Sequence, residues 1–324
     1  MIEPASIEPI VKTSRLTKRY GSIVALDGLD LAVPRGVVFG LLGPNGAGKT
    51  TTIRLLTGLA RPSSGSALVA GVETGPDRPD LQRRIGYLEQ DPRFYGWMRG
   101  RELLELIGRL HGLRGARLRA RVTETLDRVG LGEAGDRRIG GYSGGMRQRL
   151  GIGQAIVAEP ELLILDEPVS SLDPEGRRDL LALVAELRRT STVLFSTHVL
   201  ADVERVCDRV AILDRGRLVT EGPLQALLDE YAGPVYRVDP EPGQEATVAA
   251  LVSRLEAADW VASVSIQAGI VSVDVSEPRS GGPALLAAIV ESGLALAAFE
   301  RQRPTLEDVF LRLVGRDAGR NAAA

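Results

Sequence analysis

The amino-acid sequence predicts an α/β fold with a mostly parallel sheet, followed by a small α+β unit. Between about Thr13 and Leu228, unbroken runs of Val, Ile and Leu alternate with longer helical patterns. Strands that are buried on both faces of a parallel sheet have this composition. Prolines and glycines then interrupt the pattern after Tyr231, which indicates a domain boundary.

Four apolar runs are the predicted strands of the parallel sheet: residues 37–42, 162–165, 192–195 and 210–213. A different pattern lies between Arg101 and Val129, where four apolar residues recur at helical spacing: Leu103, Leu104, Ile107 and Leu110. Glycines break this stretch into pieces. We therefore expect a helical insert within the α/β body.

The C-terminal part predicts a compact α+β arrangement. We expect a helix over 246–258, a hairpin of strands 261–266 and 270–275, a helix over 284–292 and a strand over 294–299. A last helix begins at Thr305, where Thr305 and Asp308 have the spacing of a capping box. Residues 316–324 are expected to be a disordered tail.

Composition restricts the class of protein. The net charge of -2 gives no support for a nucleic-acid partner. The single cysteine, Cys207, excludes an intramolecular disulfide and is interpreted as a small buried apolar residue. The apolar stretch 283–299 would reach about 25 Å as a helix, short of the roughly 30 Å hydrocarbon core. It also carries Glu291 near its middle, so no transmembrane segment is predicted.

The strongest local motif is a phosphate-binding loop that follows a predicted strand and precedes a predicted helix. Its sequence is Gly43-Pro44-Asn45-Gly46-Ala47-Gly48-Lys49-Thr50, with the helical pattern beginning at Thr51. The glycines allow successive backbone N–H groups to point at phosphate oxygens, and the helix adds its positive N-terminal end. Lys49 is predicted to reach the outer phosphates, and the Thr50 hydroxyl to hold Mg²⁺.

A second motif is an apolar strand that ends in two acids, Asp166 and Glu167. Ligands of open α/β sheets bind at the carboxyl ends of the strands. Asp166 is therefore a candidate metal ligand. Glu167 lies one residue further, where its carboxylate can accept a proton from an attacking water.

Further elements appear in a fixed order around these two motifs: Tyr20, Gln90, Tyr142-Ser143-Gly144-Gly145-Met146, Ser171-Leu172-Asp173 and Ser196-Thr197-His198. Together they resemble the ATP-binding cassette (ABC) ATPases over about 11–228. The resemblance implies a P-loop NTPase cassette with a mostly parallel sheet, a helical subdomain and an antiparallel β portion. It places the cassette at 11–230 and a C-terminal accessory domain at 234–315.

The resemblance also implies a mechanism in which two cassettes face each other head to tail. ATP bound by the phosphate loop and Thr51 of one copy is closed over by Ser143, Gly144 and Gly145 of the other. Tyr20, ahead of the first strands, would stack on adenine, and Asp173 would lie beside the nucleotide. Gln90 would sense the metal and the water. His198 would contact the γ-phosphate, and ATP and Mg²⁺ are the implied cofactors.

The segment Tyr142-Ser143-Gly144-Gly145-Met146 matches the signature motif of the family, and two of its positions depart from the common pattern. The family begins this motif with Leu and ends it with Gln, whereas this chain has Tyr142 and Met146. Met146 lacks the amide hydrogen bonds of Gln, so a polar contact across the interface is lost. The phosphate-facing Ser-Gly-Gly core is intact, and hydrolysis is expected to persist.

The residues around Pro304 to Leu311 resemble the C-terminal extension of bacterial drug-resistance and lipid or polysaccharide exporters. This branch implies export of such a cargo through a separate integral-membrane permease. The subunit would act at the cytoplasmic face of the membrane, with a second ATPase subunit that most simply is another copy. Phe94, Tyr95 and Trp97 are candidate permease contacts or local packing. An importer ATPase, or a soluble cassette protein acting on DNA or ribosomes, remains the alternative.

Overall fold

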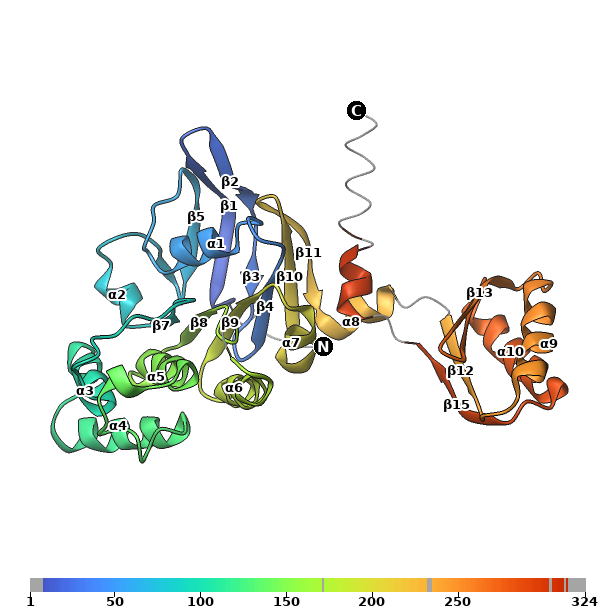
Figure 1. Ribbon diagram of the computed structural model, residues 1–324. Helices are drawn as coiled ribbons and strands as arrows, with labels where there is room; N and C mark the ends of the chain where they lie inside the picture. Colours follow the sequence, from blue (N-terminus) through green and yellow to red (C-terminus); the bar gives the residue numbers. More distant parts are fainter. Residues whose placement is uncertain (1–7, 171, 232–234, 303–304, 312, 314–324) are drawn as a thin grey trace, which may run out of the picture. The chain divides into compact units, whose positions relative to one another are not determined.

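The computed structural model describes residues 8–170, 172–231, 235–302, 305–311 and 313 (Figure 1). The described residues form two units. One comprises the described residues up to Leu224 together with Leu313, and the other runs from Gln225 to Leu311. The predicted disordered tail, 316–324, lies outside the described residues.

A six-stranded sheet forms the centre of the first unit. Its order is β11-β10-β4-β9-β8-β7, and every neighbouring pair is parallel except β10 with β11. The four predicted strands are confirmed, and every residue of β4, β8 and β9 is buried, which explains their unbroken apolar sequences. The strands are β4 (Val38–Leu42), β7 (Ile85–Leu88), β8 (Leu162–Asp166), β9 (Thr192–Thr197), β10 (Arg209–Asp214) and β11 (Arg217–Pro223).

A second, antiparallel sheet belongs to the same unit, as the resemblance implies. Its order is β2-β1-β5-β6, and β3 also pairs with β1. Tyr20 is the last residue of β1, so the expectation that it lies ahead of the first strands is wrong. The strands are β1 (Val11–Tyr20), β2 (Ile23–Leu29), β3 (Ala32–Val33), β5 (Ser64–Val69) and β6 (Val72–Glu73).

One apolar core joins both sheets to helix α1 (Lys49–Leu56). Val11 and Val69 of the antiparallel sheet share this core with Phe39 and Ile164 of the parallel sheet and with Ile53 of α1. Burial of this apolar surface holds α1, and therefore the loop before it, in a defined place on the sheet.

The predicted helical insert is confirmed. Helices α3 (Gly100–Leu110) and α4 (Gly115–Arg128) pack on each other and on α5 (Gly144–Ile156), beside strand β7 (Figure 1). His111 follows α3 as its C-cap. The remaining helices of this unit are α2 (Pro79–Gln82), α6 (Pro174–Leu187) and α7 (Leu200–Val206). Cys207 follows α7 and is buried, as predicted.

The second unit is a four-stranded antiparallel sheet, β13-β14-β12-β15, with helices α9 and α10. Val238, Leu255, Val273 and Leu285 are central in its core. Strand β12 was not predicted, and β15 begins two residues later than expected. The elements are α8 (Leu224–Glu230), where the unit begins, β12 (Val235–Pro240), α9 (Glu245–Glu256), β13 (Val261–Gln267), β14 (Ile270–Val275), α10 (Pro278–Ser292) and β15 (Leu296–Arg301).

The predicted capping box at Thr305 is confirmed. The Thr305 N–H donates to Asp308 Oδ2 at 2.9 Å, and the Asp308 N–H donates to Thr305 Oγ1 at 3.2 Å. Residues 306–311 are helical. Across the described residues, every helix is too short or too polar to cross a bilayer.

Candidate active site

The phosphate loop connects β4 to α1 in a conformation that requires glycine. Gly43, Gly46 and Gly48 have φ angles of 150°, 82° and 106°. A Cβ at Gly43 would lie 2.3 Å from the Leu213 carbonyl oxygen, so no larger residue fits there. The apolar strand and the α1 core therefore position a tight loop whose curl depends on these glycines.

The loop forms one wall of a cavity of about 430 Å³. The cavity brings together most of the predicted nucleotide-binding residues: Tyr20, Pro44, Asn45, Gly46, Ala47, Gly48, Lys49, Thr50, Thr51, Gln90, Glu167 and His198. Ile23, Val24 and Ala25 of β2 also line it, although no motif in the sequence predicted them. Their signal was weak, because only their position just after Tyr20 distinguishes them from an ordinary strand.

The carboxyl ends of β8 and β9 form the opposite wall. Asp166 and Glu167 lie at the end of β8, and Ser196 holds both of them from β9. Ser196 Oγ donates to Asp166 Oδ1 at 2.5 Å and accepts from the Glu167 N–H at 3.1 Å. Glu167 has a φ of 49°, a strained value for a side chain other than glycine. Such strain is found where function requires a particular side-chain direction.

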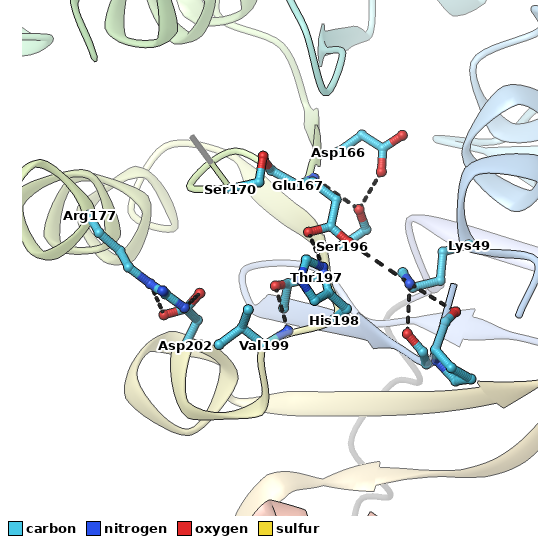
Figure 2. Close-up of polar contacts among 12 residues, drawn as sticks. Lys49, Asp166, Glu167, Ser170, Arg177, Ser196, Thr197, His198, Val199 and Asp202 are labelled. Atoms are coloured by element: carbon cyan, nitrogen blue, oxygen red, sulfur yellow. Dashed lines mark hydrogen bonds and ion pairs between the residues drawn. The ribbon is translucent and has the colours of Figure 1, made fainter. Parts of the chain in front are cut away.

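Two side chains, those of His198 and Lys49, lie against the carboxylate of Glu167 (Figure 2). His198 Nδ1 lies 2.8 Å from Glu167 Oε2, and Lys49 Nζ lies 3.9 Å from Glu167 Oε1. The Glu167 side chain is only 8% exposed, so these contacts are weakly screened by solvent. The base, the histidine and the lysine predicted from separate motifs therefore occupy a single site.

Lys49 is held by the loop as well as by the acids. Its Nζ donates to the Gly43 carbonyl at 2.6 Å and to the Pro44 carbonyl at 3.3 Å. Burial lowers the pKa of Lys49 from its ordinary value, and the charges of Glu167 and Asp166 partly offset that effect. The side chain thus places a buried cation against the phosphate loop.

The signature residues lie outside this cavity. Ser143 is the N-cap of α5, and its Oγ accepts from the Met146 N–H at 3.2 Å. Ser143 and Gly144 are exposed, and Gly145 is half-buried. Helix α5 therefore presents an exposed N-terminus, which is suited to an anion, away from the phosphate loop of its own chain.

Tyr142 has a structural explanation. Its ring is buried, and its hydroxyl donates to the Ala134 carbonyl at 2.7 Å. A Cβ at Gly100 would lie 2.5 Å from that hydroxyl, so the absence of a side chain at Gly100 makes room for Tyr where the family has Leu. The departure at Tyr142 therefore changes the packing against Gly100 and Ala134, and it leaves Ser143, Gly144 and Gly145 unaltered.

Asp173 caps helix α6, with its Oδ1 accepting from the Gly176 N–H at 2.9 Å. Its side chain is exposed and does not line the cavity. The neighbouring Ser171 lies outside the described residues.

The predicted metal ligands fit a magnesium ion. Thr50 and Gln90 line the cavity, and Asp166 adjoins its Glu167 wall. Hydroxyl, amide and carboxylate oxygens suit Mg²⁺, which keeps waters and takes phosphate oxygens as further ligands. Within the described residues, no group of three or more His, Cys, Asp or Glu side chains could hold a metal by itself. A magnesium ion held by Thr50, Gln90 and Asp166 would take waters and phosphate oxygens as its remaining ligands.

Comparisons with known proteins agree with this geometry. Residues 26–170 match the family model described as ABC transporter, and residues 222–314 match that of the ATP-binding protein DrrA1-3-like, C-terminal domain. The chain is 41% identical to the uncharacterized ABC transporter ATP-binding protein YxlF of Bacillus subtilis (strain 168), over 92% of this chain and 97% of that protein.

Two further matches extend the comparison. The daunorubicin/doxorubicin resistance ATP-binding protein DrrA of Streptomyces peucetius is 39% identical, over 95% of this chain and 93% of that protein. The structure of CbiO1 from Clostridium perfringens, part of the ABC transporter complex cbiONQ, has a TM-score of 0.64 and 29% identity. It covers 69% of this chain and 92% of CbiO1.

These matches confirm the predicted fold, the ATPase activity and the exporter assignment, and they do not favour the importer or soluble alternatives. This chain belongs to the ABC transporter ATP-binding proteins, as an ATP-hydrolysing exporter subunit with a DrrA1-3-like C-terminal domain.

Proposed function

We propose that this chain binds MgATP in the phosphate-loop cavity and hydrolyses it with Glu167 as general base. Two copies would act at the cytoplasmic face of the membrane and drive export of a drug, lipid or polysaccharide through a separate permease. The observation that carries the chemistry is that the buried carboxylate of Glu167 contacts His198 and Lys49 beside the phosphate loop.

Several side chains in and beside the cavity have proposed roles in nucleotide binding. Tyr20 stacks on adenine, while Lys49 and the loop N–H groups bind the phosphates. Thr50, Gln90 and Asp166 would hold Mg²⁺. When bound, the ion supplies positive charge that neutralises the β- and γ-phosphates.

Proton transfer is assigned to the carboxylate of Glu167. An ionised Glu167 accepts a hydrogen bond from the Nδ1–H group of His198, which fixes the direction of both side chains and leaves the carboxylate free to act as a base. Glu167 then takes the proton of the attacking water, and His198 steadies the transferred phosphoryl group. Since this reaction needs little covalent chemistry from the protein, positioning and charge account for most of the rate enhancement.

A second copy is needed because the signature does not line its own chain's cavity. The exposed N-terminus of α5, with Ser143, Gly144 and Gly145, would bind the γ-phosphate held by the partner. Asp173, exposed at the start of α6, would lie on the same face as a contact to the partner's nucleotide.

Complementation between two inactive variants tests this composite site. Ser143→Asp retains an N-cap acceptor for α5 but places a carboxylate where a phosphate would bind, and Lys49→Ala removes the phosphate-binding cation. Each variant alone should hydrolyse little ATP. Mixing the two should restore turnover, because one of the two sites then combines an intact Lys49 with an intact Ser143. If mixing restores nothing, the head-to-tail arrangement is wrong.

A permease contact is proposed for an exposed aromatic pair in the loop after Gln90. Tyr95 and Trp97 are 68% and 70% exposed, with ring centroids 5.8 Å apart. Exposed aromatic groups of this kind are typical anchors of protein interfaces. Replacing both with Ala should reduce the amount of chain in the membrane fraction of cells and leave ATP turnover of the purified chain unchanged. Undiminished membrane association would contradict this contact.

A further inference from the structure

An ion pair joins helix α6, which follows the strand end that carries Glu167, to helix α7, which follows His198 (Figure 2). Arg177 Nε donates to Asp202 Oδ1 at 2.8 Å, and Arg177 Nη2 donates to Asp202 Oδ2 at 2.7 Å. Two parallel bonds fix the orientation of the groups as well as their distance. The Asp202 side chain is 5% exposed and that of Arg177 is 33% exposed, so the pair lies mostly inside the protein.

Arg177 is tied to Asp173 through the first turn of α6. Its backbone N–H donates to the Asp173 carbonyl at 2.9 Å, and the Asp173 side chain caps the same turn at Gly176. The guanidinium of Arg177 therefore has a defined position relative to Asp173, the residue proposed to face the second copy.

Asp202 lies in α7, which begins two residues after His198. This helix has seven residues, and Val199 at its N-cap makes no side-chain hydrogen bond. A helix this short is not stable alone, so its direction depends on tertiary contacts. The buried bond to Arg177 is a contact that links α7 directly to α6.

The position of His198 depends on the direction of helix α7. Its side chain is 48% exposed, so packing alone does not immobilise the ring. The backbone on either side holds it: β9 ends at Thr197, and α7 begins at Leu200. A rotation of α7 would therefore change the 2.8 Å contact between His198 Nδ1 and Glu167 Oε2.

We propose that Arg177 and Asp202 are positioning residues for ATP hydrolysis, which hold α7 against α6 and thereby hold His198 against Glu167. The inference rests on the roles proposed above for His198 and Glu167. It adds a physical link between Asp173, at the proposed dimer face, and the histidine beside the general base.

Kinetics give the first test. Asp202→Asn preserves the shape of the side chain but removes its charge, and kcat should fall by roughly ten- to a hundredfold, as misplacement of catalytic groups by about 1 Å does. The affinity for MgATP should be unchanged, because neither residue lines the cavity. Arg177→Lys keeps the charge without the two-bond geometry and should give an intermediate kcat.

Arg188→Gln is the matched control. Arg188 and Asp208 form another Arg–Asp pair, 2.8 Å apart, at the other end of α6 and just beyond α7. This pair is half-exposed and is distant in sequence from both His198 and Asp173. Its loss should leave kcat unchanged.

Histidine NMR gives a second test that does not depend on activity. The chain has two histidines, His111 and His198, so imidazole ¹⁵N resonances are readily assigned. In Asp202→Asn, and in Arg177→Gln, the His198 signals should shift while those of His111 stay in place. Arg177→Gln alters the more exposed partner of the ion pair, so it can replace Asp202→Asn in both tests if Asp202→Asn does not fold.

The outcomes separate this inference from the proposed catalytic roles. Normal kcat in folded Asp202→Asn and Arg177→Gln overturns the inference, as do unchanged His198 resonances or an equal loss in Arg188→Gln. Full turnover in His198→Ala would instead remove His198 from the chemistry, and the NMR measurement would still report whether the pair positions its ring.

Discussion

Glu167→Gln should lower ATP turnover by about 10²–10⁴-fold, the usual contribution of a general acid–base group. Glutamine has nearly the same volume and can still contact His198, but it cannot accept a proton from water. The Glu167 side chain is 8% exposed, which limits the access of bulk water as a replacement base. MgATP should remain bound, and the closed dimer should accumulate. Steady-state hydrolysis, retention of labelled ATP and light scattering measure the three effects.

The control for this substitution is Glu124→Gln. Glu124 is a glutamate of α4 whose side chain is 62% exposed, and it pairs with Arg121, which is 11% exposed. Arg121 keeps Glu159 and the Ile156 and Val157 carbonyls as partners when Glu124 becomes neutral, so neither turnover nor stability should change appreciably. Near-normal turnover in Glu167→Gln would remove Glu167 as the base, whatever the control shows.

Lys49→Ala should weaken ATP binding by at least roughly tenfold, because hydrogen bonds to charged groups are worth about 1.5–3 kcal/mol each. The side chain is buried at the phosphate loop, and its charge also lies beside Glu167 and Asp166. Removing it takes away a phosphate ligand and leaves like charges facing the nucleotide. Fluorescent ATP-analogue titration measures the affinity, and hydrolysis at saturating ATP measures the remaining turnover.

Folding must be monitored in the same variant, because Lys49 lies 3.9 Å from the buried carboxylate of Glu167. Circular dichroism and thermal unfolding report any loss of stability. Lys12→Ala is the control, since Lys12 is an exposed lysine of β1. Lys49→Ala protein that is folded and binds ATP with unchanged affinity would contradict the assignment of the phosphate site.

Much of the fold was predictable because its strands are buried on both faces. Run 162–165 contains no polar residue, and run 192–195 contains only Thr192 at its start. Strands β8 and β9 begin at the first residues of these runs and end one and two residues after them. Strand β12 was missed because Pro240 and its neighbours suggested a linker. The structure instead pairs β12 with β14 and β15, inside the four-stranded sheet of the second unit. Pairing of this kind depends on residues far away in the sequence.

The cavity, like the fold, combines residues that local motifs predict with residues that only the tertiary structure brings in. The phosphate loop and the acidic strand end were recognisable because each is a short, local arrangement of residues. The wall formed by Ile23 to Ala25 was not, because its contribution depends on how β2 approaches the loop from another sheet. The contact of Ser196 with both Asp166 and Glu167 likewise required β8 and β9 to be neighbours.

By itself, the sequence determined which chemistry this protein carries: a glycine-rich loop that can curl around phosphate, two acids at a strand end and a histidine after another strand. Local backbone freedom and residue type are properties of short segments, so they can be read directly. Only the tertiary structure decided that Lys49 and His198 meet at the carboxylate of Glu167, and that Arg177 reaches Asp202. Those contacts join residues 25 to 118 positions apart, and burial of the shared core brings them together.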